Sequence, residues 1–60
     1  MNSELQLYLS LLSNLSRAKQ QASEFYAKTQ DPGVLDSLNL ISASINDLIT
    51  SKTAKDLIGK

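Results

Sequence analysis

Asp31-Pro32-Gly33 interrupts a 60-residue chain near its middle, and leucine-rich helical periodicity runs into it from both sides. Proline has no N–H to donate, and its ring pushes Asp31 out of the α region, so a helix arriving from the N-terminal side must end near position 29 or 30. The Asp31 carboxylate can cap a second helix, and proline is favoured at the first helical position. The break therefore predicts a turn over residues 30–33, with Asp31, Pro32 and Gly33 as its turn and cap residues.

Apolar residues recur every three or four positions on both sides of the break, which is the period of one helical face. The first helix is expected over residues 3–29. The second is expected to begin near 32 and to end near 50 or, alternatively, near 58. The predicted fold is all-α, an antiparallel two-helix hairpin. Its predicted core positions, which would also form the interface between copies, are Leu5, Tyr8, Leu12, Leu15, Ala18, Ala22, Tyr26, Val34, Leu38, Ile41, Ile45 and Leu48.

The first helix has more apolar surface than one antiparallel helix usually covers. Leu7, Leu11 and Phe25 flank its main stripe and widen the apolar arc to about 160°. We expect this flank to bind a partner. A small chain without cysteine or histidine has neither disulfides nor an ordinary zinc site to stabilise it, which favours oligomerisation.

The expected partner is a second copy of the chain. Two hairpins packed on their seams would form a four-helix bundle, and a two-fold homodimer is the default symmetry. A higher homo-oligomer and docking on another helical protein, as an adaptor or chaperone does, are the alternatives.

The last ten residues fit the helical pattern less well. The register of the second helix continues onto Lys52 and Lys55, whereas Leu57 and Ile58 fall on other sides. The chain is therefore expected to be a single domain over residues 1–60 with a tail at 51–60. For this tail, a frayed end, a short bent helix from Thr53 and docking onto a partner all remain open.

Charge and hydropathy exclude several classes of function. Six basic and six acidic residues give a net charge of zero, so no long-range field would gather nucleic acid. The longest apolar runs are pairs, far too short to span a bilayer, and the first residues lack the pattern of a secretory signal. We expect a cytoplasmic protein without a nucleic-acid partner. Attachment of the segment 5–15 to a membrane surface is the alternative, which a polar face with few lysines disfavours.

No catalytic, metal or cofactor-binding site is expected. The carboxylates lie at helix starts or on polar faces, and the Glu-x-x-His motifs of di-metal bundles do not occur. The serines have no histidine base and no nucleophile-elbow motif to activate them. The sequence therefore predicts a non-enzymatic structural or interaction module that uses no cofactor.

One ordered set of residues resembles a known family. It comprises Leu12, Leu15 and Ala18, then Glu24, then Thr29-Gln30-Asp31-Pro32, and then apolar residues at 34, 38, 41, 45, 48 and 49. This set, covering roughly residues 3–50, resembles the short helical-hairpin proteins of spore-forming Firmicutes catalogued as domain of unknown function 1657. The resemblance implies a hairpin without catalytic residues. Some members are encoded near genes for spore germination channels and spore membrane proteins.

The same resemblance implies a sporulation-related role, with the forespore or spore as an alternative location to the cytoplasm. The tail departs from the family. Its acidic, aromatic-containing ending is replaced here by Thr50-Ser51-Lys52-Thr53-Ala54-Lys55. No function of the family's tail therefore transfers to this chain.

Overall fold

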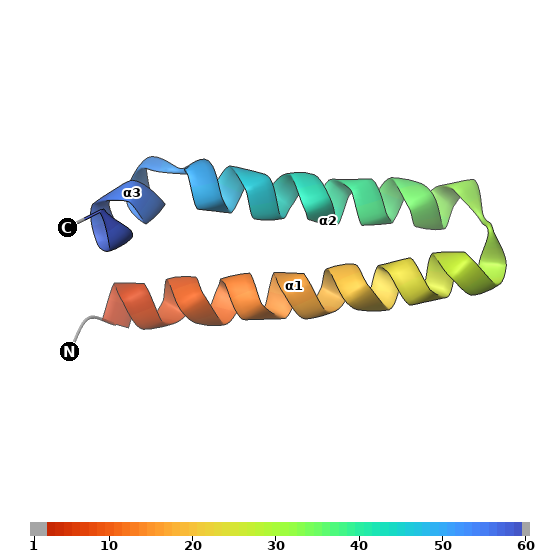
Figure 1. Ribbon diagram of the computed structural model, residues 1–60, viewed down its shortest axis with the longest axis horizontal. Helices are drawn as coiled ribbons and strands as arrows, with labels where there is room; N and C mark the ends of the chain where they lie inside the picture. The colour runs from red at the N-terminus through yellow and green to blue at the C-terminus, as the bar shows by residue number, and fades with distance from the viewer. Residues whose placement is uncertain (1–2, 60) are drawn as a thin grey trace.

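The computed structural model describes residues 3–59, and these residues form an all-α structure without any strand. Its helices are α1 (Ser3–Thr29), α2 (Pro32–Thr50) and α3 (Lys52–Ile58). Helices α1 and α2 lie side by side and antiparallel, and α3 follows α2 at the end where α1 begins (Figure 1). The outermost positions of the predicted 1–60 domain, residues 1–2 and 60, lie outside the described residues.

The turn between α1 and α2 is built by the residues next to Pro32. Gln30 ends α1 with a left-handed backbone, at a φ of 53°. Asp31 has an extended backbone, and its Oδ1 accepts a hydrogen bond from the Gly33 N–H at 2.7 Å. Because Pro32 and Gly33 already belong to α2, the turn predicted at 30–33 narrows to two residues.

Replacing Asp31 with alanine is expected to remove the cap of α2 and to destabilise the protein by about 1 kcal/mol. In a domain of this size, that loss lowers the melting temperature by roughly 4–8 °C, which thermal denaturation followed by circular dichroism would measure. Asp47→Ala is the matched control. It removes a carboxylate near the C-terminal end of the same helix, where the macrodipole disfavours one, and is expected not to lower the melting temperature. Equal melting temperatures for the two variants would contradict the capping role.

A second break occurs at Ser51. Its backbone is extended, with a ψ of 155°, so the α2 helix cannot continue through it. Its hydroxyl donates to the Leu48 carbonyl at 2.8 Å and accepts from the Ala54 N–H at 3.1 Å, which closes α2 and caps α3. Of the two predicted ends of the second helix, the structure has the one near 50. The predicted two-helix hairpin thus gains a third helix, α3, which corresponds to the short bent helix among the three possibilities for the tail and begins at Lys52, one residue before Thr53.

The helices form a single layer. The principal extents are 42 × 18 × 12 Å, and the shortest is close to the diameter of one helix, about 10–12 Å. The radius of gyration is 13.8 Å, whereas a compact domain of this length has about 10 Å. Since domain cores normally lie between packed layers, both broad faces of the α1–α2 layer remain open.

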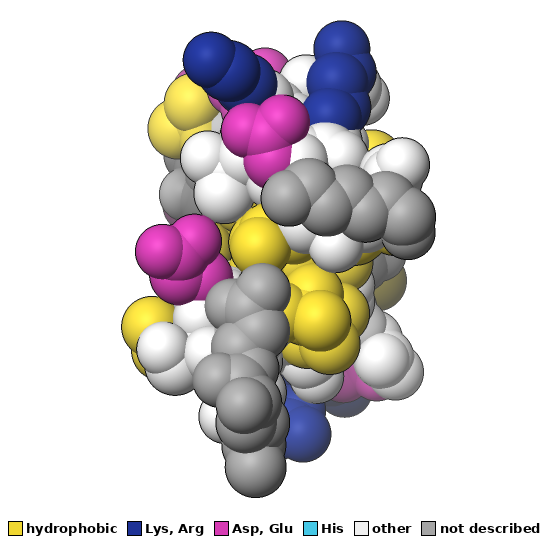
Figure 2. All heavy atoms as spheres, turned by 90° about the vertical axis from the view of Figure 1, so that its left-hand side faces the viewer, with side chains coloured by type: hydrophobic (Ala, Val, Ile, Leu, Met, Phe, Trp, Pro, Cys, Tyr) yellow, Lys and Arg dark blue, Asp and Glu magenta, His cyan; other side chains and the backbone are white. Residues whose placement is uncertain are grey.

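The best-buried residues lie at the end of the molecule that carries α3. Among residues 3–59 only Tyr8 and Ala54 are buried, with 6% and 3% of their surface exposed. Tyr8 belongs to α1 and Ala54 to α3. Figure 2 looks at this end and shows hydrophobic side chains at its centre, with charged side chains towards the rim. Helix α3 therefore covers the end of the seam between α1 and α2.

Candidate interaction surface

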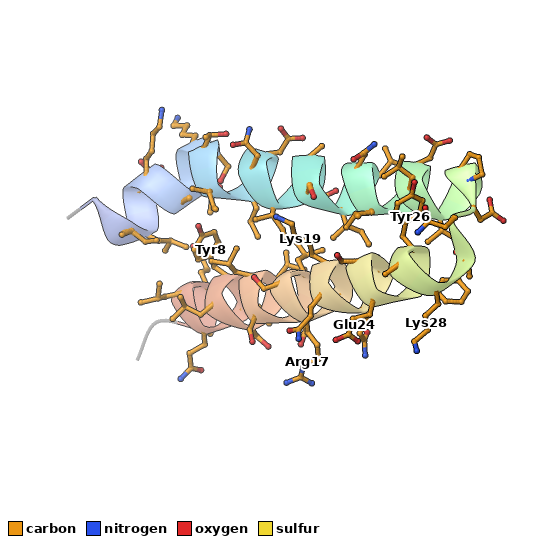
Figure 3. The ribbon with its side chains drawn as sticks, turned by 45° about the vertical axis from the view of Figure 1, so that its right-hand side comes forward. Tyr8, Arg17, Lys19, Glu24, Tyr26 and Lys28 are labelled. Carbon is orange, nitrogen blue, oxygen red and sulfur yellow. The ribbon has the colours of Figure 1, made fainter. Side chains whose placement is uncertain are left out.

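The predicted core residues all lie along the seam between α1 and α2. Tyr8 is buried, and Tyr26 points towards α2 near the turn (Figure 3). The members that are half-buried are Leu5, Leu12, Leu15, Ala18, Ala22, Tyr26, Val34, Leu38, Ile41, Ile45 and Leu48. No side chain among residues 3–59 is completely enclosed. The two helices thus cover each other's apolar stripes only in part.

Lys19 interrupts the apolar seam. Leu12, Lys19 and Tyr26 follow one another at steps of seven, so Lys19 occupies a position where the pattern calls for an apolar residue. Figure 3 shows Lys19 extending from α1 towards α2, whereas Arg17 and Lys28 project from the far side of α1. The residue is exposed. Its aliphatic stem can lie along the seam while the ammonium group reaches water.

One broad face of the α1–α2 layer is hollowed by two adjoining shallow grooves that share Leu11 and Leu48. The other residues lining them are Leu15, Ser44, Asp47 and Ser51 for the first groove, and Glu4, Leu7, Tyr8 and Thr53 for the second. Since residues seven apart share a helical face, Ala18 and Phe25 continue this face on α1, and Ser37 and Leu40 continue it on α2. We define the groove face as Leu7, Leu11, Ala18, Phe25, Ser37, Leu40, Ser44 and Ser51.

The groove face holds the most exposed large apolar side chains. Leu7 and Leu40 are 71% and 69% exposed, and Leu11 and Phe25 are about half exposed. Leu7, Leu11 and Phe25 are the flank predicted to bind a partner. Leu7 and Leu11 line the grooves, and the helical period of α1 puts Phe25 on the same face. Leu40 was not predicted because it lies off the apolar seam of α2. The sequence places Leu40 four residues before Ser44, so the two are neighbours on the surface of α2. This spacing identifies Leu40 only after Ser44 is known to line a groove.

Ser37, Ser44 and Ser51 form a row of small side chains at steps of seven along the α2 side of the groove face. Each hydroxyl donates to a backbone carbonyl oxygen three or four residues earlier in the chain. Ser37 donates to Gly33 at 3.2 Å, Ser44 to Leu40 at 2.9 Å and Ser51 to Leu48 at 2.8 Å. Because these donors are already paired, another helix can cover the row at a small desolvation cost. The groove face therefore has a bulky apolar half on α1, and its α2 half consists of this row of small side chains with Leu40 beside it.

The opposite broad face is less apolar. Helical periodicity places Leu9 of α1 and Ile49 of α2 on it, and both are about half exposed. Serines at 16, 23 and 42 occupy much of the space between its ends. The apolar surface of this face is therefore discontinuous, in contrast to that of the groove face.

Ala54 anchors α3 against the rest of the molecule and was not predicted. Its signal in the sequence is Ser51, a preferred N-cap residue three positions earlier, whose hydroxyl accepts from the Ala54 N–H. Gly59 ends this helix where a Cβ atom would lie 2.5 Å from the Lys55 carbonyl oxygen, so only glycine fits there. Ser51 and Gly59 thus fix both ends of α3.

Replacing Ser51 with alanine is expected to release α3 and to cost about 1 kcal/mol, because the hydroxyl serves both adjoining helices. Hydrogen exchange would report the release as faster exchange of the Ala54 amide than in the natural protein. Ser44→Ala is the matched control, since the Ser44 hydroxyl donates to a helical carbonyl but caps nothing. Unchanged protection of Ala54 in Ser51→Ala would contradict the role of Ser51.

The described residues offer little for metal or membrane chemistry. Between residues 3 and 59 no cluster of three or more histidine, cysteine, aspartate or glutamate side chains is placed to hold a metal ion. No helix in that range is both long and apolar enough to cross a bilayer. Comparison with known proteins finds no matching family model, no significantly similar curated protein and no significantly similar solved structure.

Proposed function

We propose that this chain is a non-enzymatic interaction module, a helical hairpin that associates with copies of itself to form a four-helix bundle. One observation carries the proposal: large apolar side chains remain exposed on a single layer of helices that encloses no side chain completely. Exposed apolar surface of this kind usually marks an interface. A second layer, supplied by another copy, would complete the core.

The surface area supports the same proposal. The accessible surface is 4616 Å², about 700 Å² more than a compact monomer of 6.6 kDa exposes. A standard protein–protein interface buries about 800 Å² on each partner. The excess surface of one chain is therefore close to what a homodimer would bury.

Sedimentation equilibrium at micromolar concentration tests the proposal. The natural chain is expected to sediment with twice its 6.6 kDa mass, and a folded monomer would contradict self-association. The double variant Phe25→Gln/Ile49→Gln, which places a polar amide on each broad face, is expected to weaken association by about tenfold or more. Ser10→Gln/Asn39→Gln, the same number of glutamines at exposed polar sites, is the control that should leave association unchanged.

A role in sporulation rests on the family resemblance alone. It predicts that the protein accumulates in sporulating cells and not in vegetative cells, which immunoblotting would measure. Equal amounts in both would remove this part of the proposal and leave self-association untouched.

A further inference from the structure

We propose that the groove face binds a second copy of this chain, with α1 of each copy packed across α2 of the other around a two-fold axis parallel to the helices. This inference rests on the self-association proposed above. It adds which face forms the contact and which helix meets which.

The shape of the groove face is complementary to itself. Its α1 half is bulky, through Leu7, Leu11 and Phe25, and its α2 half is small along the row of serines, with Leu40 as a large apolar side chain beside that row. A two-fold axis parallel to the helices places the bulky half of each copy over the small half of the other in a single contact. A two-fold axis that lies in the plane of the layer, perpendicular to the helices, would instead place α1 on α1 and bulky residues on bulky residues.

The register of this arrangement follows from the protomer. A two-fold axis parallel to the helices preserves the height of every residue along them. Helix positions that lie at the same height within one copy therefore meet between copies. Leu11 and Ser51 line the same groove in one copy. Because the helices are antiparallel, steps of seven up α1 and down α2 place Ala18 of one copy over Ser44 of the other, and Phe25 over Ser37.

Charge favours the same pairing of helices. Helix α2 carries Asp36 and Asp47 and no cation, whereas α1 carries more cations than carboxylates. Packing α1 across α2 brings opposite charges together, and packing α2 on α2 would bring carboxylates together. Lys28 lies three positions after Phe25, and Asp36 lies four positions before Leu40, so both lie at the outer rim of the groove face and on the same edge of the proposed contact.

Disulfide trapping tests the geometry, because the natural chain has no cysteine. Ala18→Cys and Ser44→Cys chains are mixed, refolded together and oxidised, and the disulfide-linked species are identified by mass spectrometry. We expect the mixed dimer to exceed either symmetric dimer several-fold. Ser42→Cys replaces Ser44→Cys in the control, since it makes the same change two residues away on the opposite face and is expected to give no mixed disulfide with Ala18→Cys.

A second measurement separates the faces by affinity. Leu7→Gln, on the groove face, is expected to raise the dimer Kd by about tenfold. Leu9→Gln, the same substitution on the opposite face, is expected to leave the Kd within about twofold of the natural value.

The outcomes distinguish this inference about the contact face from the proposed self-association. A dominant symmetric disulfide of Ala18→Cys would place α1 on α1 and overturn the geometry while self-association stands. A mixed disulfide with Ser42→Cys, or a larger effect of Leu9→Gln than of Leu7→Gln, would move the contact to the opposite face and overturn the inference. A natural chain that sediments as a monomer would overturn both.

Discussion

Replacing Tyr8 with alanine is expected to unfold most of the protein at room temperature. Tyr8 is the only buried residue of α1, and it lines a groove together with Leu48 of α2 and Thr53 of α3. Truncating a buried aromatic ring to alanine costs about 3–5 kcal/mol. A domain of this length has only roughly 3–9 kcal/mol of stability in total. The loss of helical circular dichroism and of a cooperative melting transition would measure the effect.

The other tyrosine provides the matched control. Tyr26 lies on the same face of α1 but is only half-buried, so Tyr26→Ala is expected to cost clearly less than Tyr8→Ala. Tyr8→Phe keeps the ring and is expected to stay within about 1.5 kcal/mol of the natural protein. If Tyr8→Ala melts no lower than Tyr26→Ala, the junction of the helices does not depend on the Tyr8 ring.

Replacing Lys19 with leucine is expected to stabilise the protein. The change places an apolar side chain where the seam between α1 and α2 now holds a lysine, and burying part of a leucine is worth about 1–2 kcal/mol. In a domain of this size, the melting temperature should rise by roughly 5–15 °C. A polar residue at one seam position also restricts the register and number of packed helices, so the variant is expected to form additional, larger species in sedimentation.

Arg17→Leu is the matched control for this prediction. It removes the same charge and adds the same side chain on the side of α1 that faces away from α2 (Figure 3). We expect it to raise the melting temperature much less than Lys19→Leu does. Equal shifts in the two variants would mean that position 19 is not part of the seam.

The main helices were predictable because their signals are local. Pro32 cannot continue a helix and Asp31 can cap one, and these two properties alone fix where α1 gives way to α2. The apolar period then identifies the residues along the seam, from Leu5 to Leu48. The all-α class follows from these signals without any knowledge of how the helices pack.

Features that depend on packing were not predictable. A short bent helix was one of three possibilities that the sequence left open for the tail. The choice between them depends on the Ser51 hydroxyl, which bonds on both sides of a single extended residue and so closes α2 and caps α3. Leu40 belongs to the groove face only because of the rotation of α2 about its axis. That rotation decides which side of α2 lies beside the flank of α1. This rotation cannot be predicted from the spacing of residues within one helix.

The two-residue connection at Gln30 and Asp31 has a consequence for folding kinetics. The loop that must close before α1 and α2 can meet is about as short as a helix–helix connection can be, so little chain entropy opposes their first contacts. Helical proteins dominated by such local contacts fold in microseconds to milliseconds. The protomer is therefore expected to fold before it meets a partner, and the concentration-dependent meeting of two folded chains is expected to be the slow step of assembly.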